Sequence, residues 1–301
     1  METPGGGSFK EALIIPNVDK EGIAQMVKTV GQCLERMGVK HFLLSDDAEA
    51  LGNIDMPPTV ERLDENVDLA IVLGGDGTVL HAVDVLWDKD VPLVGINIGK
   101  MGFLTTAEMH ETEEVLDKIF AGRYWISERV PVACTLGTEV GSEEFHALNE
   151  IVIGKLVRER LIHLSTYING EYFMRYSGDG LIFSSATGST AYSLSSGGPV
   201  VTPELKCFLL TPICAHMLFS RPMVLDACDR VKVVVEEGPE RLALSIDGRQ
   251  DVEVPKGANI EFYSSGKTVR IIELYGSSFY RTLREKFLSP PSGTEHQAGS
   301  T

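Results

Sequence analysis

Three features are scarce or missing in this sequence, and each absence excludes a class of protein. The longest apolar stretch, 207–219, is interrupted by Pro212 and His216 and falls short of the roughly 18 residues that a membrane-spanning helix needs. The five cysteines are odd in number and form no C-x-x-C pair, so we expect reduced thiols and neither a disulfide framework nor a zinc knuckle. Residues 1–8 are glycine-rich and lack the basic start and apolar core of a secretory signal, so we expect a cytoplasmic protein.

Positive charge is a fourth scarce feature. The chain has 27 Lys and Arg against 43 Asp and Glu, a formal net charge of −16. This balance repels nucleic acid and anionic membranes, so we expect neither as a partner. It also means that a bound phosphate needs local donors: backbone N–H groups, a few Lys or Arg side chains, and metal ions. The histidines His81, His163 and His216 are scattered and lack the spacing of zinc ligands.

In the first half of the chain, strand-like and helix-like segments alternate. Apolar runs predict strands at 12–16, 41–44, 69–73 and 92–96, and helical spacing of apolar residues is found over 23–37, 79–86 and 111–120. Such alternation predicts a parallel sheet covered by helices. The acidic, proline-interrupted segment 45–68 is expected to be a surface excursion.

After Tyr124 the pattern changes to short strands. Asn169-Gly170 between two apolar runs is a strong hairpin signal, predicting strands at 164–168 and 172–176. Further strands are predicted at 181–184, 230–236, 241–246, 259–263 and 269–274. The second half is therefore expected to be mainly antiparallel β, with a domain boundary near residue 125.

The turn Gly74-Gly75-Asp76-Gly77-Thr78 lies between a predicted buried strand and a helix. Open α/β sheets place ligands at the carboxyl ends of their strands, and glycines let backbone N–H groups approach phosphate oxygens. A carboxylate beside a phosphate is repulsive unless it accepts a proton or binds a metal, which makes Asp76 a candidate catalytic group. The alternative is that Asp76 only caps the following helix.

Two other segments could form ligand-binding loops. Residues 97–104 begin with Asn97 and contain two glycines at the end of the next predicted strand, although a plain turn fits the same pattern. Residues 184–198 are rich in hydroxyl and small side chains and lie between apolar segments of the β-rich half. We interpret the second segment as a loop with many hydrogen-bond donors, in which Tyr192 could stack on a flat ring or bond a ribose, and not as a linker.

Taken together, these motifs resemble those of the NAD kinases. The matching segments are Gly74–Thr78, Asn97–Leu104, Leu148-Asn149-Glu150, Asp179–Ile182, Thr187–Ser195 and Gly197-Gly198-Pro199. The resemblance runs in order from about residue 11 to 287. The first turn alone is shared with diacylglycerol-type lipid kinases and loosely with phosphofructokinases, whereas Thr-Gly-Ser-Thr-Ala-Tyr is far more specific. The resemblance implies the NAD kinase and diacylglycerol kinase-like fold: an α/β N-terminal domain with a parallel sheet and a mainly antiparallel β C-terminal domain.

The resemblance also implies an activity, namely transfer of the γ-phosphoryl group of ATP, or of another phosphoryl donor, to the 2′-hydroxyl of the adenosine ribose of NAD. Asp76 would accept the hydroxyl proton, with Gly77 lining the same pocket. The other implied NAD-binding residues are Asn149, Glu150, Arg160, Asp179, Thr190, Ala191, Tyr192, Ser193, Leu194, Ser195 and Arg249. The implied phosphate- and ATP-binding residues are Gly74, Gly75, Gly77, Thr78 and Asn97.

The implied cofactor is Mg²⁺ or another divalent metal, with protein ligands left unknown, and the implied assembly is a homodimer or homotetramer. Two positions depart from the family pattern. Many relatives carry an Arg where this chain has Ser177, so that contact is either absent or taken over by Arg175. Many relatives also have Thr-Pro-Thr-Gly where this chain has 185–188, Ser-Ala-Thr-Gly.

The expected organisation is a phosphate-donor-binding domain at 9–124, a dinucleotide-binding domain at 125–275, a C-terminal segment at 276–288 that returns to the first domain, and a disordered tail at 289–301. Two rival functions remain, a lipid kinase and a non-catalytic NAD-binding regulator. The acidic charge balance disfavours the first, and the intact Asp76 disfavours the second.

Overall fold

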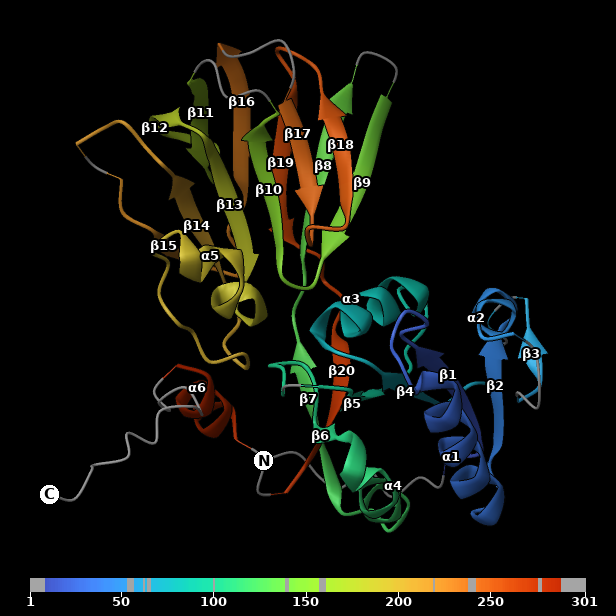
Figure 1. Ribbon diagram of the computed structural model, residues 1–301. Coiled ribbons are helices and arrows are strands. Elements are labelled where there is room, and N and C mark those ends of the chain that lie inside the picture. Colours follow the sequence, from blue (N-terminus) through green and yellow to red (C-terminus); the bar gives the residue numbers. More distant parts are fainter. Residues whose placement is uncertain are drawn as a thin grey trace, which may run out of the picture. The chain divides into compact units, whose positions relative to one another are not determined.

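The computed structural model describes residues 9–52, 57–61, 63, 66–99, 101–138, 141–156, 161–218, 220–237, 242–275 and 278–287. Arg160 and the predicted tail at 289–301 lie outside these ranges. The chain divides into two compact units (Figure 1). Unit 1 comprises Met1–Val79, Val94–Trp125 and Ile272–Thr301, and unit 2 comprises Leu80–Leu93 and Ile126–Ile271.

The first sheet is mainly parallel, as the alternating pattern predicted. Its strands follow the order β3-β2-β1-β4-β5-β20-β7, and β6 also pairs with β5. β4 is buried along its whole length. Its uninterrupted apolar run is typical of a strand in a sheet that is covered on both faces. The strand bounds are β1 Glu11–Pro16, β2 Lys40–Leu44, β3 Thr59–Val60, β4 Leu69–Leu73, β5 Leu93–Asn97, β6 Ala107–Glu108, β7 Tyr124–Arg129 and β20 Val269–Leu274.

Three helices, α1, α3 and α4, form at the predicted places, whereas α2 and α6 were not predicted. α1 buries an apolar stripe that includes Ile23, Val27, Val30 and Leu34, the spacing from which it was predicted. The segment 45–68, expected to be only a surface excursion, instead contains α2 and the edge strand β3. The helix bounds are α1 Ile23–Arg36, α2 Ser45–Ala50, α3 Asp76–Val85, the 3-10 turn η1 Met109–Glu111, α4 Thr112–Phe120 and α6 Phe279–Phe287.

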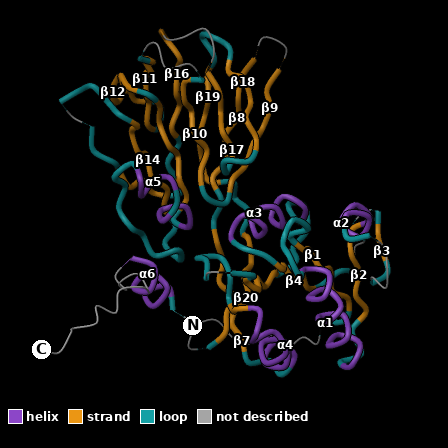
Figure 2. The backbone as a smooth tube through the Cα atoms, in the orientation of Figure 1, coloured by secondary structure: helices purple, strands orange, loops and turns teal. Residues whose placement is uncertain are grey.

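Unit 2 is built on two six-stranded antiparallel sheets, and strands dominate it in Figure 2. One sheet has the order β12-β11-β16-β19-β8-β9, and the other β15-β14-β13-β10-β17-β18. Phe183 of the second sheet stacks on Phe262 of the first, with ring centroids 3.5 Å apart, so the two sheets share one apolar core. The strand bounds are β8 Val132–Thr138, β9 Gly141–Ala147, β10 Glu150–Lys155, β11 Ile162–Ile168, β12 Glu171–Gly178, β13 Gly180–Ser185, β14 Cys207–Ile213, β15 Met223–Asp226, β16 Val231–Glu237, β17 Leu242–Ile246, β18 Gln250–Val254 and β19 Asn259–Ser264.

The predicted hairpin is confirmed. Asn169 and Gly170 connect β11 to β12 with φ values of 51° and 86°, the left-handed pair that a two-residue turn of this type requires. The prediction that the strand at 269–274, which is β20, belongs to the antiparallel half was wrong. β20 pairs in parallel with β5, between β5 and β7 of the first sheet, because an apolar run shows that a strand is buried without showing which strand it pairs with.

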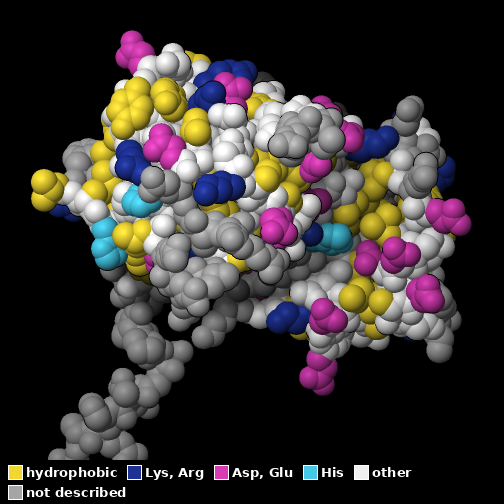
Figure 3. Space-filling model, turned by 90° about the horizontal axis from the view of Figure 1, so that it is seen from above, with side chains coloured by type: hydrophobic (Ala, Val, Ile, Leu, Met, Phe, Trp, Pro, Cys, Tyr) yellow, Lys and Arg dark blue, Asp and Glu magenta, His cyan; other side chains and the backbone are white. Residues whose placement is uncertain are grey.

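Among the described residues, no helix is long and apolar enough to cross a membrane. On the face seen in Figure 3, acidic and basic side chains are interspersed over its described part, so the acidic excess is not gathered there into one patch. All five cysteines are free thiols.

Candidate functional site

In unit 1, Asp76 is the first residue of α3, directly after Gly74 and Gly75. Its carboxylate reaches across to the second turn, in residues 97–104. Oδ2 accepts the backbone N–H of Phe103, and Oδ1 accepts that of Leu104, both at 2.9 Å. The side chain remains 33% exposed, so part of the carboxylate is open to a ligand. The two turns that the sequence singled out separately are therefore joined through Asp76.

Asn97 lies at the same end of the first sheet as Asp76, at the carboxyl end of β5. It ends β5, is only 2% exposed, and its side-chain oxygen lies beside Gly75. Its Nδ2 is buried without a hydrogen-bond partner, an unfavourable state that a bound acceptor would relieve. Gly74 fits closely against the side chain of Thr78, since a Cβ on Gly74 would lie 2.2 Å from Oγ1 of Thr78. Gly77 is exposed in the first turn of α3.

In unit 2, the serine-rich segment folds into two short turns after β13, η2 Thr187–Thr190 and α5 Tyr192–Ser195. Several of its hydroxyls bond the protein itself. Ser189 bonds both backbone groups of Val201, and Ser193 pairs with Thr211 at 2.9 Å. The remaining residues of the stretch, Thr190, Ala191, Leu194 and Ser195, are half-buried or exposed. The segment is thus a compact, internally bonded loop and not a linker.

Asn149 and Glu150 are held by a residue whose role the sequence did not reveal. The carboxylate of Asp247 accepts the backbone N–H groups of Leu148, Asn149 and Glu150 at 2.8–2.9 Å. Asp247 itself has a φ of 49°, in the turn between β17 and β18. Burial raises the pKa of Asp247 to about 6, although the three donors oppose that rise. Asp247 therefore fixes the entry to β10, where Glu150 begins the strand.

Glu150 is an unusual carboxyl group. It is 7% exposed, and its Oε2 is buried without a partner. Burial, with a smaller contribution from Asp247, raises the pKa of Glu150 to about 8, although the backbone N–H of Tyr192 favours the charged form. At neutral pH Glu150 is therefore mainly protonated and can donate as well as accept a hydrogen bond.

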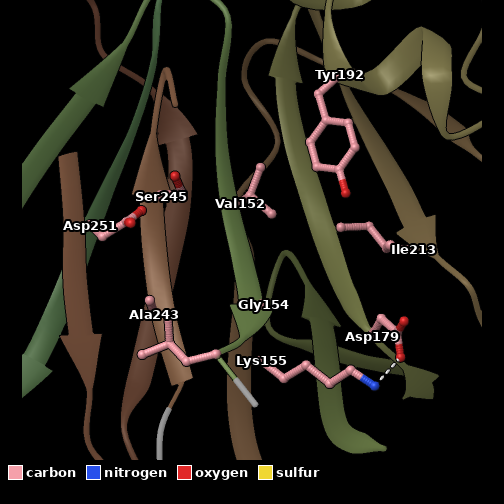
Figure 4. A pocket seen from close by; sticks show the side chains of 10 residues that line it. Val152, Gly154, Lys155, Asp179, Tyr192, Ile213, Ala243, Ser245 and Asp251 are labelled. Atoms are coloured by element: carbon pink, nitrogen blue, oxygen red, sulfur yellow. Dashed lines mark ion pairs between the residues drawn. The ribbon is translucent and has the colours of Figure 1, made fainter. Parts of the chain in front are cut away.

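A cavity of about 590 Å³ opens on the face of the second sheet of unit 2 that turns away from the core (Figure 4). Along β10, Ile151 and Ile153 enter the core, so alternation directs Val152 and Glu150 to the opposite, cavity-bearing face. The cavity is lined by Val152, Gly154, Lys155, Leu156, Asp179, Tyr192, Ile213, Ala243, Ser245 and Asp251.

Lys155 and Asp179 form an ion pair at one end of this cavity, with Nζ 2.5 Å from Oδ1 (Figure 4). The Lys155 side chain is only 13% exposed, whereas the Asp179 side chain is 35% exposed, so the carboxylate remains accessible from the cavity. Arg175, the cation that the sequence offered as an alternative, instead contacts Glu236 at 3.3 Å. Ser177 bonds His163. Within the described residues, a cation beside Asp179 therefore comes from β10. The sequence did not reveal it because strand pairing, not chain proximity, brings it there.

Arg249 contacts α3. It pairs with Asp84 at 2.5 Å and approaches Nδ1 of His81 at 3.1 Å. Asp84 also lies 3.8 Å from Nε2 of His146, whose ring stacks on Trp87. Burial lowers the pKa of His81, and the positive charge of Arg249 lowers it further.

Within the described residues, no group of three or more His, Cys, Asp or Glu side chains is placed to hold a metal ion.

The chain matches two family models that follow one another. The ATP-NAD kinase N-terminal domain matches residues 13–124, and the ATP-NAD kinase C-terminal domain matches residues 148–274.

Relatives match over most of their length. The chain is 37% identical to the NAD kinase of Symbiobacterium thermophilum, covering 92% of this chain and 98% of that protein. It is 33% identical to the NAD kinase of Natranaerobius thermophilus, covering 91% and 96%. An NAD kinase from Archaeoglobus fulgidus, solved in complex with ATP, superposes with a TM-score of 0.72 at 26% identity, covering 92% and 98%. Yeast NADH kinase complexed with NADH shares the fold, with a TM-score of 0.86 at 24% identity, covering 95% and 90%. Because whole-length relatives exceed 30% identity and both domain models match in order, this chain belongs to the ATP-NAD kinase family.

Proposed function

We propose that this protein transfers the γ-phosphoryl group of ATP to the 2′-hydroxyl of the adenosine ribose of NAD, producing NADP. Family membership supports the reaction class, and the Archaeoglobus relative crystallised with ATP supports the donor. The lipid kinase and regulator alternatives are not favoured by any of the matches. We assign binding of the phosphate donor to the N-terminal α/β part, 9–124, and binding of the dinucleotide to the β-rich part, 125–275.

The observation that carries this proposal is the anchored carboxylate of Asp76. Two backbone N–H groups at 2.9 Å fix its orientation, and one-third of the side chain stays exposed. A general base needs this combination of fixed geometry and access. In the proposed step the 2′-oxygen bonds the γ-phosphorus and its proton passes to Asp76. The bond from that phosphorus to the β,γ-bridging oxygen breaks, and its electron pair stays on ADP.

The phosphates of ATP are proposed to lie against the Gly74–Thr78 turn. The first N–H groups of a helix have no partner within it, and the start of α3 carries a partial positive charge. The buried Nδ2 of Asn97, a residue whose side-chain oxygen lies beside Gly75, supplies a further donor that is unsatisfied in the structure. Gly77 is proposed to line the same pocket, where its lack of a side chain leaves room for the ligand.

The dinucleotide is proposed to use the exposed face of the second sheet of unit 2 and its cavity. Glu150, protonated at neutral pH, can both donate to and accept from a nucleobase edge or a ribose hydroxyl. Asp179, paired with Lys155, is proposed to accept hydrogen bonds from the nicotinamide ribose, and Tyr192 is positioned at the cavity to stack or bond. The further proposed NAD contacts are Asn149, Arg160, Thr190, Ala191, Ser193, Leu194, Ser195 and Arg249.

Mg²⁺ or another divalent metal is the proposed cofactor. The described residues hold no group of three or more His, Cys, Asp or Glu side chains placed for a metal ion, and we propose that the metal would bind together with ATP, whose phosphate oxygens are ligands that Mg²⁺ prefers. Such an ion would neutralise phosphate charge during transfer.

We further propose a cytoplasmic location and a homodimer or homotetramer. The five free thiols suit a reducing compartment. Apolar side chains on the surface of unit 2, including Leu205 at 56% and Val224 at 54% exposure, suit burial against another copy. Light scattering of the purified protein tests the assembly.

The activity is tested by measuring NADP formation from NAD and Mg-ATP with wild type, Asp76→Asn and a matched control. Asp88→Asn is that control, because Asp88 is 86% exposed and pairs with Lys267. We expect wild type and the control to form NADP, and Asp76→Asn to bind NAD but to lose at least about 1000-fold in kcat. No NADP from folded wild type, with any triphosphate or polyphosphate donor, would overturn the proposed reaction.

A further inference from the structure

Lys286, close to the end of α6, lies beside Asp76. Its Nζ is 4.0 Å from Oδ2 of Asp76, and its side chain is 32% exposed. At this distance the two charges attract without a direct hydrogen bond, so the ammonium hydrogens remain available to another acceptor. Both residues belong to unit 1 although 210 positions separate them in the sequence.

An aromatic cluster holds Lys286 in this place. Its ammonium group lies over the ring of Phe103, 4.5 Å from the centroid. Phe103 in turn contacts Phe279 and Phe287 at the two ends of α6, with ring centroids 6.0 and 6.1 Å apart. The same Phe103 donates its backbone N–H to Asp76. One residue therefore positions both the carboxylate and the lysine.

The negative charges around the site would be stabilised by a cation next to Asp76. The whole chain carries a formal net charge of −16, and Asp76 places one of its negative charges within the turn proposed to hold phosphates. During phosphoryl transfer, negative charge is spread over the equatorial oxygens of the moving group. A flexible lysine within 4.0 Å of the base can reach an acceptor on the neighbouring phosphoryl group without moving its backbone.

We propose that Lys286 is a catalytic residue whose ammonium group binds the transferred phosphoryl group beside Asp76, so that α6 completes the phosphoryl-transfer centre. This proposal rests on the proposed kinase activity. Lys286 donates hydrogen bonds to the γ-phosphoryl oxygens and stabilises their charge during transfer. It neither gains nor loses a proton, because the 2′ proton passes to Asp76.

The test compares Lys286→Gln, Lys286→Arg and Arg284→Gln in the full-length protein. Arg284→Gln is the matched control, since it removes one positive charge from the exposed surface of the same helix. For each protein, kcat and the KM values for NAD and ATP are measured, together with the dissociation constant of NAD and the melting temperature. Wild-type NADP formation in the same assay shows whether the underlying reaction holds, independently of Lys286.

We expect Lys286→Gln to lower kcat by about 10- to 100-fold while the NAD dissociation constant changes less than about twofold. Lys286→Arg should recover a measurable part of kcat, and Arg284→Gln should stay within about twofold of wild type. An unchanged kcat in Lys286→Gln would overturn the proposal. Equal losses of kcat in Lys286→Gln and Lys286→Arg, with lowered melting temperatures in both, would also overturn it. The lysine would then only hold α6 against Phe103.

If Lys286→Gln does not fold, the same question is put to Lys286→Ala with added ethylamine. Rescue of kcat by the amine in Lys286→Ala, and not in Arg284→Ala, supports a direct role of the ammonium group. Failure of every amine to restore activity in a folded Lys286→Ala protein argues against it.

Discussion

The carboxylate of Asp76 occupies the space that a side chain on Gly102 would fill. A Cβ on Gly102 would lie 1.8 Å from Oδ1 of Asp76, too close for any adjustment that leaves the carboxylate in place. The glycine of the second turn is therefore part of how the base is positioned, together with the N–H groups of Phe103 and Leu104.

Gly102→Ala is expected to displace Asp76 and to lower kcat by about 100-fold, because displacing a reacting group by about 1 Å has an effect of that size. The measurement is steady-state NADP formation, with a thermal melt to verify folding. Gly137→Ala is the control, since its Cβ would be 3.4 Å from the carbonyl oxygen of Asn259, an ordinary contact. A fully active Gly102→Ala protein would show that the carboxylate need not stay where the structure has it.

Asn97→Leu should weaken the use of ATP without lowering the stability of the protein. The substitution removes a buried Nδ2 that has no partner, so the melting temperature should stay level or rise. If Nδ2 serves a phosphate of ATP, the KM for ATP should rise about tenfold at the same time. Calorimetry and kinetics on one preparation measure both. A lower melting temperature with an unchanged KM for ATP would mean that Asn97 is structural.

Lys155→Met should weaken NAD binding by leaving Asp179 without its cation. We expect the KM for NAD to rise about 3- to 10-fold with a smaller change in kcat, because the pair lies in the cavity that is proposed to bind NAD. Lys232→Met, at an exposed position of β16, is the control. The interpretation fails if both variants bind NAD as wild type does.

Glu150 predicts a pH dependence of stability. Its pKa is about 8 in the folded protein against 4.5 when exposed, so between these values the folded state binds the extra proton. The stability associated with the neutral carboxyl is therefore complete below about pH 4.5 and is lost as pH rises through 8, by roughly 3–5 kcal/mol in total.

Glu150→Gln should remove this dependence, because glutamine stays neutral. Urea unfolding at pH 6 and pH 9, compared between wild type and variant, measures it. Equal loss of stability in both proteins between the two pH values would assign the effect to other groups, of which Asp247, with a pKa of about 6, is the first to examine.

The sequence predicts β1, β2, β4 and β5 of the first sheet because local apolar runs define them, but it does not predict β3, β6 or β7. The apolar run at 69–73 became β4, and the spacing of Ile23 to Leu34 became α1. It could not assign β20 to that sheet, since the partner of a buried strand is decided by the packing of the whole unit.

The candidate site, too, could be predicted only where local sequence signals define it. Asp76 and Asn97 were identifiable because they follow predicted strands. The contacts of Lys155 with Asp179, of Gly102 with Asp76 and of Asp247 with the backbone of 148–150 were not, because they exist only after strands and turns from distant parts of the chain come together.

The position of β20 also bears on how the protein is made. β20 lies between β5 and β7 in the first sheet, yet it is the last strand to be synthesised. A nascent chain that stops short of Val269 holds β4, β5 and β7 but lacks the strand that joins β7 to the others. The sheet that carries Asp76 can therefore close only when nearly the whole chain has left the ribosome, and premature termination anywhere in the β-rich unit yields a chain in which that sheet is never complete.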